Sequence, residues 1–330
     1  MCNFAHLHCH SKHSMFDGLN ASSELVARAA ELGQPGIGLT DHGNIYGAAQ
    51  FFKACQKHGI KGVIGMEIYE AVPHEWILER DKEIMNTKFG EGHRYFHLTV
   101  WCQDEIGWEN LCAIHTKSYT ENFKLKNKNQ ALVDRATLEQ HSEGLIIGLG
   151  CMASRTNQHL IDNEDELAYQ TAKWYPEVFG DRVYCEVMGN LAEQQKLIRP
   201  QRKIAQRLGV KVVATNDVHY RYQADGVENG PHHMIVQARF RKKAEDAEKS
   251  GDKSDAGYGQ WYGTDEFYLK SEEDMRNTGG IQESDLTTSL EILDRVSFDF
   301  SKLQKPAPPT APIPSPGEDP GFEAFLAAHK

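Results

Sequence analysis

Short apolar runs recur along the chain as far as Thr215, and most of them are separated by polar stretches whose apolar positions have helical spacing. Seven of these runs have the length and composition of buried strands. They lie at residues 4–10, Gly36–Thr40, Gly62–Tyr69, Tyr95–Trp101, Leu145–Leu149, Arg182–Val187 and Lys211–Thr215. Helices are predicted near residues 22–32, 44–58, 104–118 and 165–178, with another ending at Leu208 that Pro200 should begin or kink. This alternation predicts a parallel sheet with helices outside it.

Side chains of the kinds that bind metals follow strands one, two, three, four, five and seven of this set. An open parallel sheet concentrates its binding site at one switch point. A ring of strands brings many strand ends to a common mouth. The sequence therefore predicts an α/β fold with a closed or nearly closed barrel.

The end of the chain has a different composition. Residues 239–255 form a charged segment, expected to be a solvated helix or loop, and residues 305–321 are rich in proline and should form an extended linker. We therefore expect one domain over residues 1–300, followed by a linker and short tail over residues 301–330.

Composition and charge narrow the function classes. The net charge of −11 argues against a broad, sequence-independent grip on nucleic acid, although metal ions in a cleft supply positive charge locally. The seven cysteines are scattered without a Cys-x-x-Cys pair, as expected of free thiols in a reducing compartment. The sequence shows neither an apolar run long enough to span a membrane nor a secretory signal. These features predict a cytoplasmic protein, in the host cytoplasm if the gene belongs to a phage, with no membrane partner.

The candidate chemistry is a mixed set of nitrogen, oxygen and sulfur ligands. Alternate residues of a strand face the same side, so the imidazoles of His8 and His10 reach one metal ion or two adjacent ones, and Asp217 and His219 repeat this spacing. Taken singly, several members have structural explanations: an ion pair to a neighbouring strand for Glu67, and a small buried side chain for Cys151. The full candidate set is His8, His10, Asp17, His42, Glu67, His97, Cys151, Asp217 and His219.

Nine ligands are too many for one ion, since Zn²⁺ or Mn²⁺ takes four to six. The sequence therefore predicts two or three divalent ions, Zn²⁺ or Mn²⁺, with Fe²⁺ also accepted by such ligands. Paired metals suit the hydrolysis of phosphate esters, because they stabilise both the attacking and the leaving oxygen. The chain contains no phosphate-binding glycine loop, nucleophile elbow or dinucleotide fingerprint.

Several stretches resemble the polymerase and histidinol phosphatase (PHP) family, and most closely the amino-terminal PHP domain of bacterial DNA polymerase III alpha subunits. The matching stretches are residues 6–11, 16–18, 39–44, 59–67, 95–98, 144–151, 214–220 and 267–271. The resemblance implies a distorted (β/α)7 barrel with a trinuclear metal site. It further implies a metal-dependent 3′–5′ exonuclease of the proofreading type, because every ligand position is filled by a suitable residue. The choice of His97 over His93 rests on the match of Tyr-x-His-Leu.

The resemblance leaves rival functions open. Nothing here resembles the paired aspartates of the polymerase palm, so this chain alone should not polymerise DNA. The first hypothesis is an exonuclease acting on DNA 3′ ends, with Lys12 and Arg155 near the mouth as candidate phosphate contacts or ordinary surface residues. The second is a phosphatase acting on small phosphomonoesters. The third is a non-catalytic module that docks a DNA polymerase or another replisome subunit through the tail after Lys305.

Overall fold

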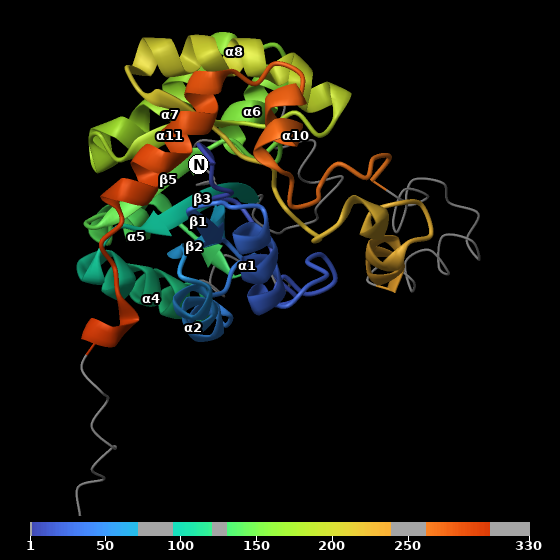
Figure 1. Cartoon of the computed structure of the whole chain (residues 1–330). Coiled ribbons are helices and arrows are strands. Elements are labelled where there is room, and N and C mark those ends of the chain that lie inside the picture. Colours follow the sequence, from blue (N-terminus) through green and yellow to red (C-terminus); the bar gives the residue numbers. More distant parts are fainter. Residues whose placement is uncertain (1, 72–94, 121–130, 239–261, 304–330) are drawn as a thin grey trace, which may run out of the picture. The chain divides into compact units, whose positions relative to one another are not determined.

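Seven strands form the centre of this computed structural model, which describes residues 2–71, 95–120, 131–238 and 262–303 (Figure 1). The predicted charged segment at 239–255, the proline-rich segment and His93 therefore lie outside the described residues. Residues Met1–Phe298 form one compact unit, and Asp299–Lys330 form a second. The strands are β1 Gly36–Leu39, β2 Lys61–Ala71, β3 Tyr95–Cys102, β4 Leu132–Val133, β5 Leu145–Leu149, β6 Val183–Val187 and β7 Lys211–Ala214.

The strand order follows the chain, but one strand runs in the opposite direction. The sheet has the order β1-β2-β3-β5-β6-β7, with the short β4 paired to β2. Strand β3 is antiparallel to both of its neighbours, β2 and β5, whereas the other pairings are parallel. The prediction of an all-parallel sheet is therefore wrong at β3. Strand direction depends on the path of the preceding connection, and here that path crosses residues 72–94, whose sequence shows no period.

The predicted first strand is an extended segment that closes the sheet. The amide of Gly38 in β1 donates to the carbonyl of His6 at 2.6 Å, and on the other side the amide of His10 donates to the carbonyl of Val218 at 2.7 Å. Residues 6–10 thus lie between β1 and the segment after β7, with isolated parallel bridges on each side. The result is the expected distorted barrel, with this segment completing the ring.

Helices pack around the strands in the order of the sequence. Helices α1 and α2 pack against each other and against β1, α4 packs against β3, α7 against β5, α8 against β6, and α11 against β7 (Figure 1). Their bounds are α1 Ser22–Glu31, α2 Ala48–His58, α4 Glu105–Thr120, α5 Arg135–Gln140, α6 Arg155–Ile161, α7 Asp165–Phe179, α8 Ala192–Leu208, α10 Glu272–Asn277 and α11 Glu283–Arg295, with 3-10 turns η3 Gln223–Asp225 and η5 Phe300–Lys302. Helix α8 contains Pro200 in its interior, so the proline does not begin it.

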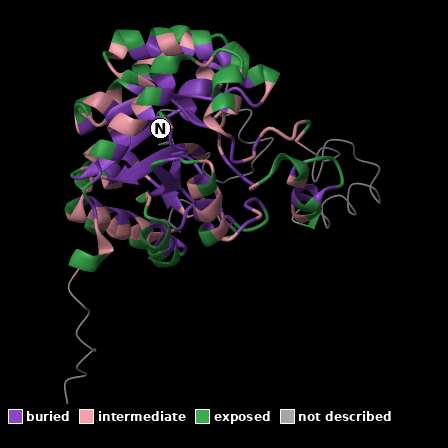
Figure 2. Ribbon diagram, in the orientation of Figure 1, coloured by how far each residue is buried: buried purple, intermediate pink, exposed green. Residues whose placement is uncertain are grey.

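Alternation along the strands separates an apolar outer face from a polar interior. On β2, Met66 and Ile68 belong to the main hydrophobic core, while Glu67 between them belongs to the interior cluster described below. On β3, Leu98 and Val100 lie in the same core. Figure 2 shows the strands and the inward sides of the helices as buried and the outward helical faces as exposed. The core therefore lies between the sheet and its helices, and the barrel interior is left free for polar side chains.

A tryptophan fills the barrel interior below these polar side chains. Trp101 is fully buried, and its indole N–H donates to the carbonyl of Leu7 at 2.8 Å. A Cβ atom added to Gly148 on β5 would clash with Oε1 of Glu186 and come within 2.7 Å of the Trp101 ring. Glycine is therefore required at this position, because any other residue would displace both the buried Glu186 carboxylate and the indole.

No described helix is both long enough and apolar enough to cross a membrane.

Candidate metal centre

The nine predicted ligands come together at one end of the barrel. His8 and His10 lie on the closing segment, His42 follows β1, Glu67 lies on β2, and Cys151 follows β5. His97 is the third residue of β3, which in a parallel strand would lie at the far end of the barrel. Because β3 is antiparallel, His97 pairs with Tyr69 near the end of β2 and reaches the same mouth. The reversed strand is what allows His97 to join the other ligands.

Glu67 lies at the centre of one half of the cluster. Its Oε2 atom is 2.7 Å from Nδ1 of His42 and 3.3 Å from Nε2 of His10. Its Oε1 atom is 3.0 Å from Nδ1 of His97, and the Cys151 sulfur lies 3.6 Å from that same nitrogen. The Glu67 carboxylate thus contacts three candidate ligands directly, and it is linked to Cys151 through His97.

Two aspartates complete the other half of the cluster. Oδ1 of Asp217 is 3.0 Å from Nε2 of His10 and 3.4 Å from Nε2 of His8. Oδ2 of Asp17 is 2.9 Å from Nε2 of His42, and its Oδ1 is 3.3 Å from Nε2 of His219. The side chain of His8 is fully buried and that of His97 is 21% exposed, so the cluster opens to solvent on the His97 side.

Two of the histidines are held by outer partners so that, in their neutral form, an unprotonated nitrogen faces inward. Nδ1 of His8 lies 2.9 Å from the buried carboxylate of Glu186, so this nitrogen carries the proton and Nε2 keeps its lone pair. Nδ1 of His10 lies 2.9 Å from the Ser14 hydroxyl, which itself donates to Asp41, so Ser14 accepts from His10. Outer partners that fix the tautomer of a histidine in this way are a regular feature of metal sites.

Several inward-facing atoms of the cluster lack a hydrogen bond. Among the described residues, no hydrogen-bond partner exists for His8 Nε2, His10 Nε2, His42 Nδ1, Glu67 Oε2 and Asp217 Oδ1. These buried atoms are all acceptors when the histidines are neutral, and leaving them unpaired is costly. Each nevertheless lies close to another acceptor, which requires a cation or a proton between them. The donor set therefore fits divalent cations.

The pKa values of the clustered groups show the same demand for positive charge. Burial by itself would lower the pKa of His8 and of His42. For His8, the carboxylates of Glu186 and Asp217 outweigh burial and raise the pKa well above its ordinary value. For His42, the Glu67 carboxylate has the same effect on the pKa. Burial raises the pKa of Glu67, but the neighbouring histidines lower it well below the ordinary value. The carboxylates thus stay ionised and draw protons onto imidazoles when metal is absent.

Sequence reasoning missed the residues that support the ligands. Glu186 is fully buried on β6 and also accepts from the Thr215 hydroxyl at 2.9 Å. The Tyr262 hydroxyl donates to Oδ1 of Asp17 at 2.6 Å, although Tyr262 is distant in sequence. A carboxylate within an otherwise apolar strand was a signal for Glu186, as it was for Glu67. Nothing local in the sequence indicated Tyr262.

The two candidate phosphate contacts differ in their surroundings. Lys12 is exposed in the loop that leads to Asp17. Arg155 is the first residue of α6 and is only 8% exposed, so it is not an ordinary surface arginine. A contact of either residue with phosphate stays a prediction.

Comparison with known proteins places these residues in a family. A family model described as the PHP domain matches residues 6–190. The chain is 36% identical over 275 residues to the DNA polymerase III subunit alpha of Treponema pallidum, covering 83% of this chain and 21% of that protein. It is 32% identical over 322 residues to the same subunit of Deinococcus radiodurans, covering 94% of this chain and 22% of that protein. The chain thus spans about a fifth of the length of these curated relatives.

A solved structure gives a weaker likeness. It is a two-domain protein of Bacteroides vulgatus containing a predicted PHP-like metal-dependent phosphoesterase, with 13% identity and a TM-score of 0.38. The superposition covers 88% of this chain and 68% of that chain.

Proposed function

Because the chain belongs to the PHP domain family, we propose that it is a metal-dependent phosphoesterase that removes nucleotides from the 3′ ends of DNA. The proposed ligands are the nine clustered residues His8, His10, Asp17, His42, Glu67, His97, Cys151, Asp217 and His219. Together they would hold two or three divalent ions, Zn²⁺ or Mn²⁺, with Fe²⁺ also compatible with the donor set.

One observation carries this proposal: buried lone pairs of histidines and carboxylates converge without hydrogen bonds. His42 Nδ1 and Glu67 Oε2 lie 2.7 Å apart, and neither has a hydrogen-bond partner among the described residues. A structural core would pair such atoms or replace them with apolar groups. A site built to receive cations instead leaves them free and fixes their orientation from outside.

The roles of the protein groups follow from their contacts. Bound divalent ions would supply the Lewis acidity that activates water and stabilises charge on the phosphate and the leaving oxygen. Glu186 and Ser14 hold the proton on Nδ1 of His8 and of His10, so that Nε2 of each faces the interior. Tyr262 keeps one oxygen of Asp17 oriented by donating its hydroxyl proton.

The choice of DNA rests on the relatives. The proteins matched over most of this chain are named as DNA polymerase III subunit alpha. We infer that the site acts on a 3′ terminus, in the manner of a proofreading nuclease, and that a DNA polymerase or another replisome subunit is its partner. Hydrolysis of small phosphomonoesters and a purely docking role are the alternative outcomes of the following experiment.

The test is a gel assay with 5′-labelled primers. One primer is matched at its 3′ end and one is mismatched, and each is incubated with Mn²⁺, with Zn²⁺ or with chelator. The proposal predicts stepwise shortening from the 3′ end that chelator and Asp217→Asn both abolish. The matched control Asp294→Asn changes an exposed aspartate on α11 and should leave shortening intact.

Three results would contradict the proposal or a part of it. Unchanged primers together with phosphate release from small esters would identify a phosphatase. Unchanged primers from a protein without bound metal would favour the docking role. Nuclease activity that persists in Asp217→Asn would instead refute the ligand assignment.

A further inference from the structure

We propose that the outer face of helix α8 binds the phosphodiester backbone of a single nucleic-acid strand, away from the metal centre. This inference concerns a second binding surface and does not depend on hydrolysis. Its residues are Gln195, Arg199, Lys203 and Gln206, together with Arg202 and Gln282 at the edge of the same hollow. We call this surface the α8 face.

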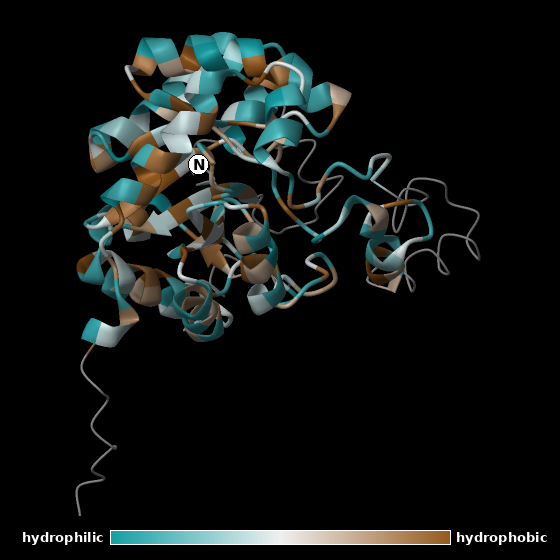
Figure 3. Ribbon diagram, viewed as in Figure 1, coloured by the Kyte–Doolittle hydropathy of each residue, from teal (hydrophilic) through white to brown (hydrophobic). Residues whose placement is uncertain are grey.

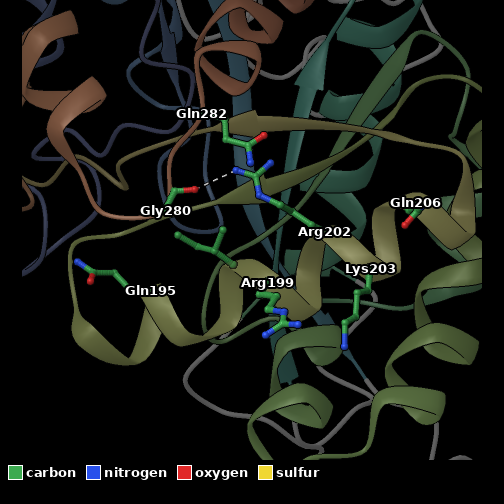
Figure 4. Close-up of a pocket in the computed structure, with 8 residues that line it drawn as sticks. Gln195, Arg199, Arg202, Lys203, Gln206, Gly280 and Gln282 are labelled. Atoms are coloured by element: carbon green, nitrogen blue, oxygen red, sulfur yellow. Dashed lines mark hydrogen bonds between the residues drawn. The ribbon is translucent and has the colours of Figure 1, made fainter.

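A hollow of about 410 Å³ lies along this helix. It is lined by three basic side chains, three glutamine amides, Ile198 and the backbone of Gly280, and none of its lining residues is acidic. Figure 4 shows Arg202 turned toward Gly280 and Gln282, and the head groups of Arg199 and Lys203 turned away from them. Guanidinium, ammonium and amide groups are hydrogen-bond donors, and a site lined by them suits phosphate oxygens.

The charge of α8 is opposite to that of the protein. The chain carries a net charge of −11, yet the seventeen residues of α8 include five basic residues and one acidic residue. Its outward surface is mostly hydrophilic (Figure 3). A local concentration of cations on an acidic protein can attract a polyanion that the protein as a whole would repel.

Two of these cations have no partner within the part of the chain that the structure describes. Arg202 is neutralised by Asp285, with Nη1 2.8 Å from Oδ1, and also donates to the carbonyl of Gly280 at 3.0 Å. Arg207, farther along the helix, pairs with Glu166 at 2.9 Å. Neither Arg199 nor Lys203 makes a hydrogen bond or ion pair with any described residue, and both are exposed.

The placement of Arg199 and Lys203 costs helix stability, because neither side chain makes an ion pair with a described residue that would offset the repulsion. Lys196 lies three positions before Arg199, Arg202 lies three positions after it, and Lys203 lies four positions after it. Residues three and four positions apart are neighbours on a helix surface, so these like charges repel one another. Gln195 and Gln206 stand where a glutamate would have relieved this repulsion. Arg199 and Lys203 are about 6 Å apart along the helix axis, so their long side chains can contact two phosphates of one extended strand at the same time.

The experiment measures binding rather than cleavage. Fluorescence anisotropy of a labelled single-stranded oligonucleotide is recorded with the full chain in chelator, across a series of NaCl concentrations. The test variant is Arg199→Gln/Lys203→Gln, and the control is Lys53→Gln/Lys57→Gln, which removes two exposed lysines four positions apart on α2. Each lost phosphate contact lowers the slope of log K against log salt by about 0.7. We expect a decrease of about 1.4 for the α8 variant and none for the control.

Three results would overturn the proposal. The first is an unchanged salt slope in the α8 variant. The second is displacement of the oligonucleotide by inorganic phosphate well beyond that by chloride at equal ionic strength, which would indicate a discrete phosphate site. The third is poly-glutamate binding as tightly as the oligonucleotide, which would indicate an acidic protein partner. Because glutamine favours helix and both positions are exposed, the variants should fold; equal helical circular dichroism verifies this.

Discussion

Replacing Glu186 with alanine should weaken metal binding although Glu186 is not one of the proposed ligands. The change removes the buried acceptor that lies 2.9 Å from Nδ1 of His8. Without it, the remaining partner of Nδ1 is the Thr99 hydroxyl at 3.2 Å, which can donate as well as accept. The His8 proton is then no longer held on Nδ1 and can move to Nε2, the nitrogen that faces Glu67 and Asp217. The proposed ligand would then present a proton where a lone pair is needed.

The size of the effect follows from the contact that is lost. Loss of a partner that orients a ligating histidine weakens metal binding by about 10- to 100-fold, or about 1.4–2.8 kcal/mol. A buried hydrogen bond to a charged group is worth about 1.5–3 kcal/mol, so the two estimates agree. Glu186→Gln keeps an oxygen acceptor of the same shape, and its loss should lie nearer the 10-fold end.

The assay is a competition titration of Zn²⁺ against a chelating dye. The chain supplies a matched control, since Nδ1 of His159 lies 2.9 Å from Glu164 in a similar pair outside the cluster. Glu164→Gln should leave metal affinity unchanged. A folded Glu186→Ala protein that binds Zn²⁺ as tightly as the unmodified chain would refute the reasoning. If that variant does not fold, Thr215→Val, which removes the other donor to Glu186, should show a smaller loss.

Three further predictions concern stability, each measured by urea unfolding in chelator. Burial lowers the pKa of His6 to about 3, so below pH 6.5 the unfolded chain binds a proton at this residue that the folded protein does not; between pH 8 and pH 5 the change in the free energy of unfolding should therefore be about 2 kcal/mol less favourable in the unmodified chain than in His6→Gln. Arg135→Ala strands the buried carboxylate of Glu70, 2.8 Å from Arg135 Nε, and should cost about 3–5 kcal/mol; a cost under about 1 kcal/mol would contradict this. Gly148→Ala pushes a methyl group against the Glu186 carboxylate and the Trp101 ring and should cost about 1–3 kcal/mol, unlike an alanine at the open position Gly180, whose cost would come from its φ of 62° alone.

Local patterns determined where the strands lie and which residues stand near their ends. Short continuous apolar runs located the strands, because such a run is a property of neighbouring residues. The ligand-type residues were visible for a related reason: Glu67 interrupts an apolar strand, and Asp217 and His219 directly follow one. The structure brings all nine predicted side chains into one linked cluster, and their role as metal ligands stays a prediction.

Strand direction was decided only by the tertiary structure. The sequence of β3 does not differ from that of a parallel strand, because direction is set by the connection before it and by pairing with strands distant in the sequence. The antiparallel course of β3 carries His97 to the mouth, where a parallel strand would have carried it away.

The outer partners of the ligands were also decided by the fold. The contact of Glu186 with His8 joins residues 178 positions apart, and that of Tyr262 with Asp17 joins residues 245 positions apart. Such pairs leave no periodic signal, because each depends on packing that exists only once the barrel has closed. The sequence thus specifies the candidate ligands, while the closed barrel fixes the tautomers and orientations that would make them a metal site.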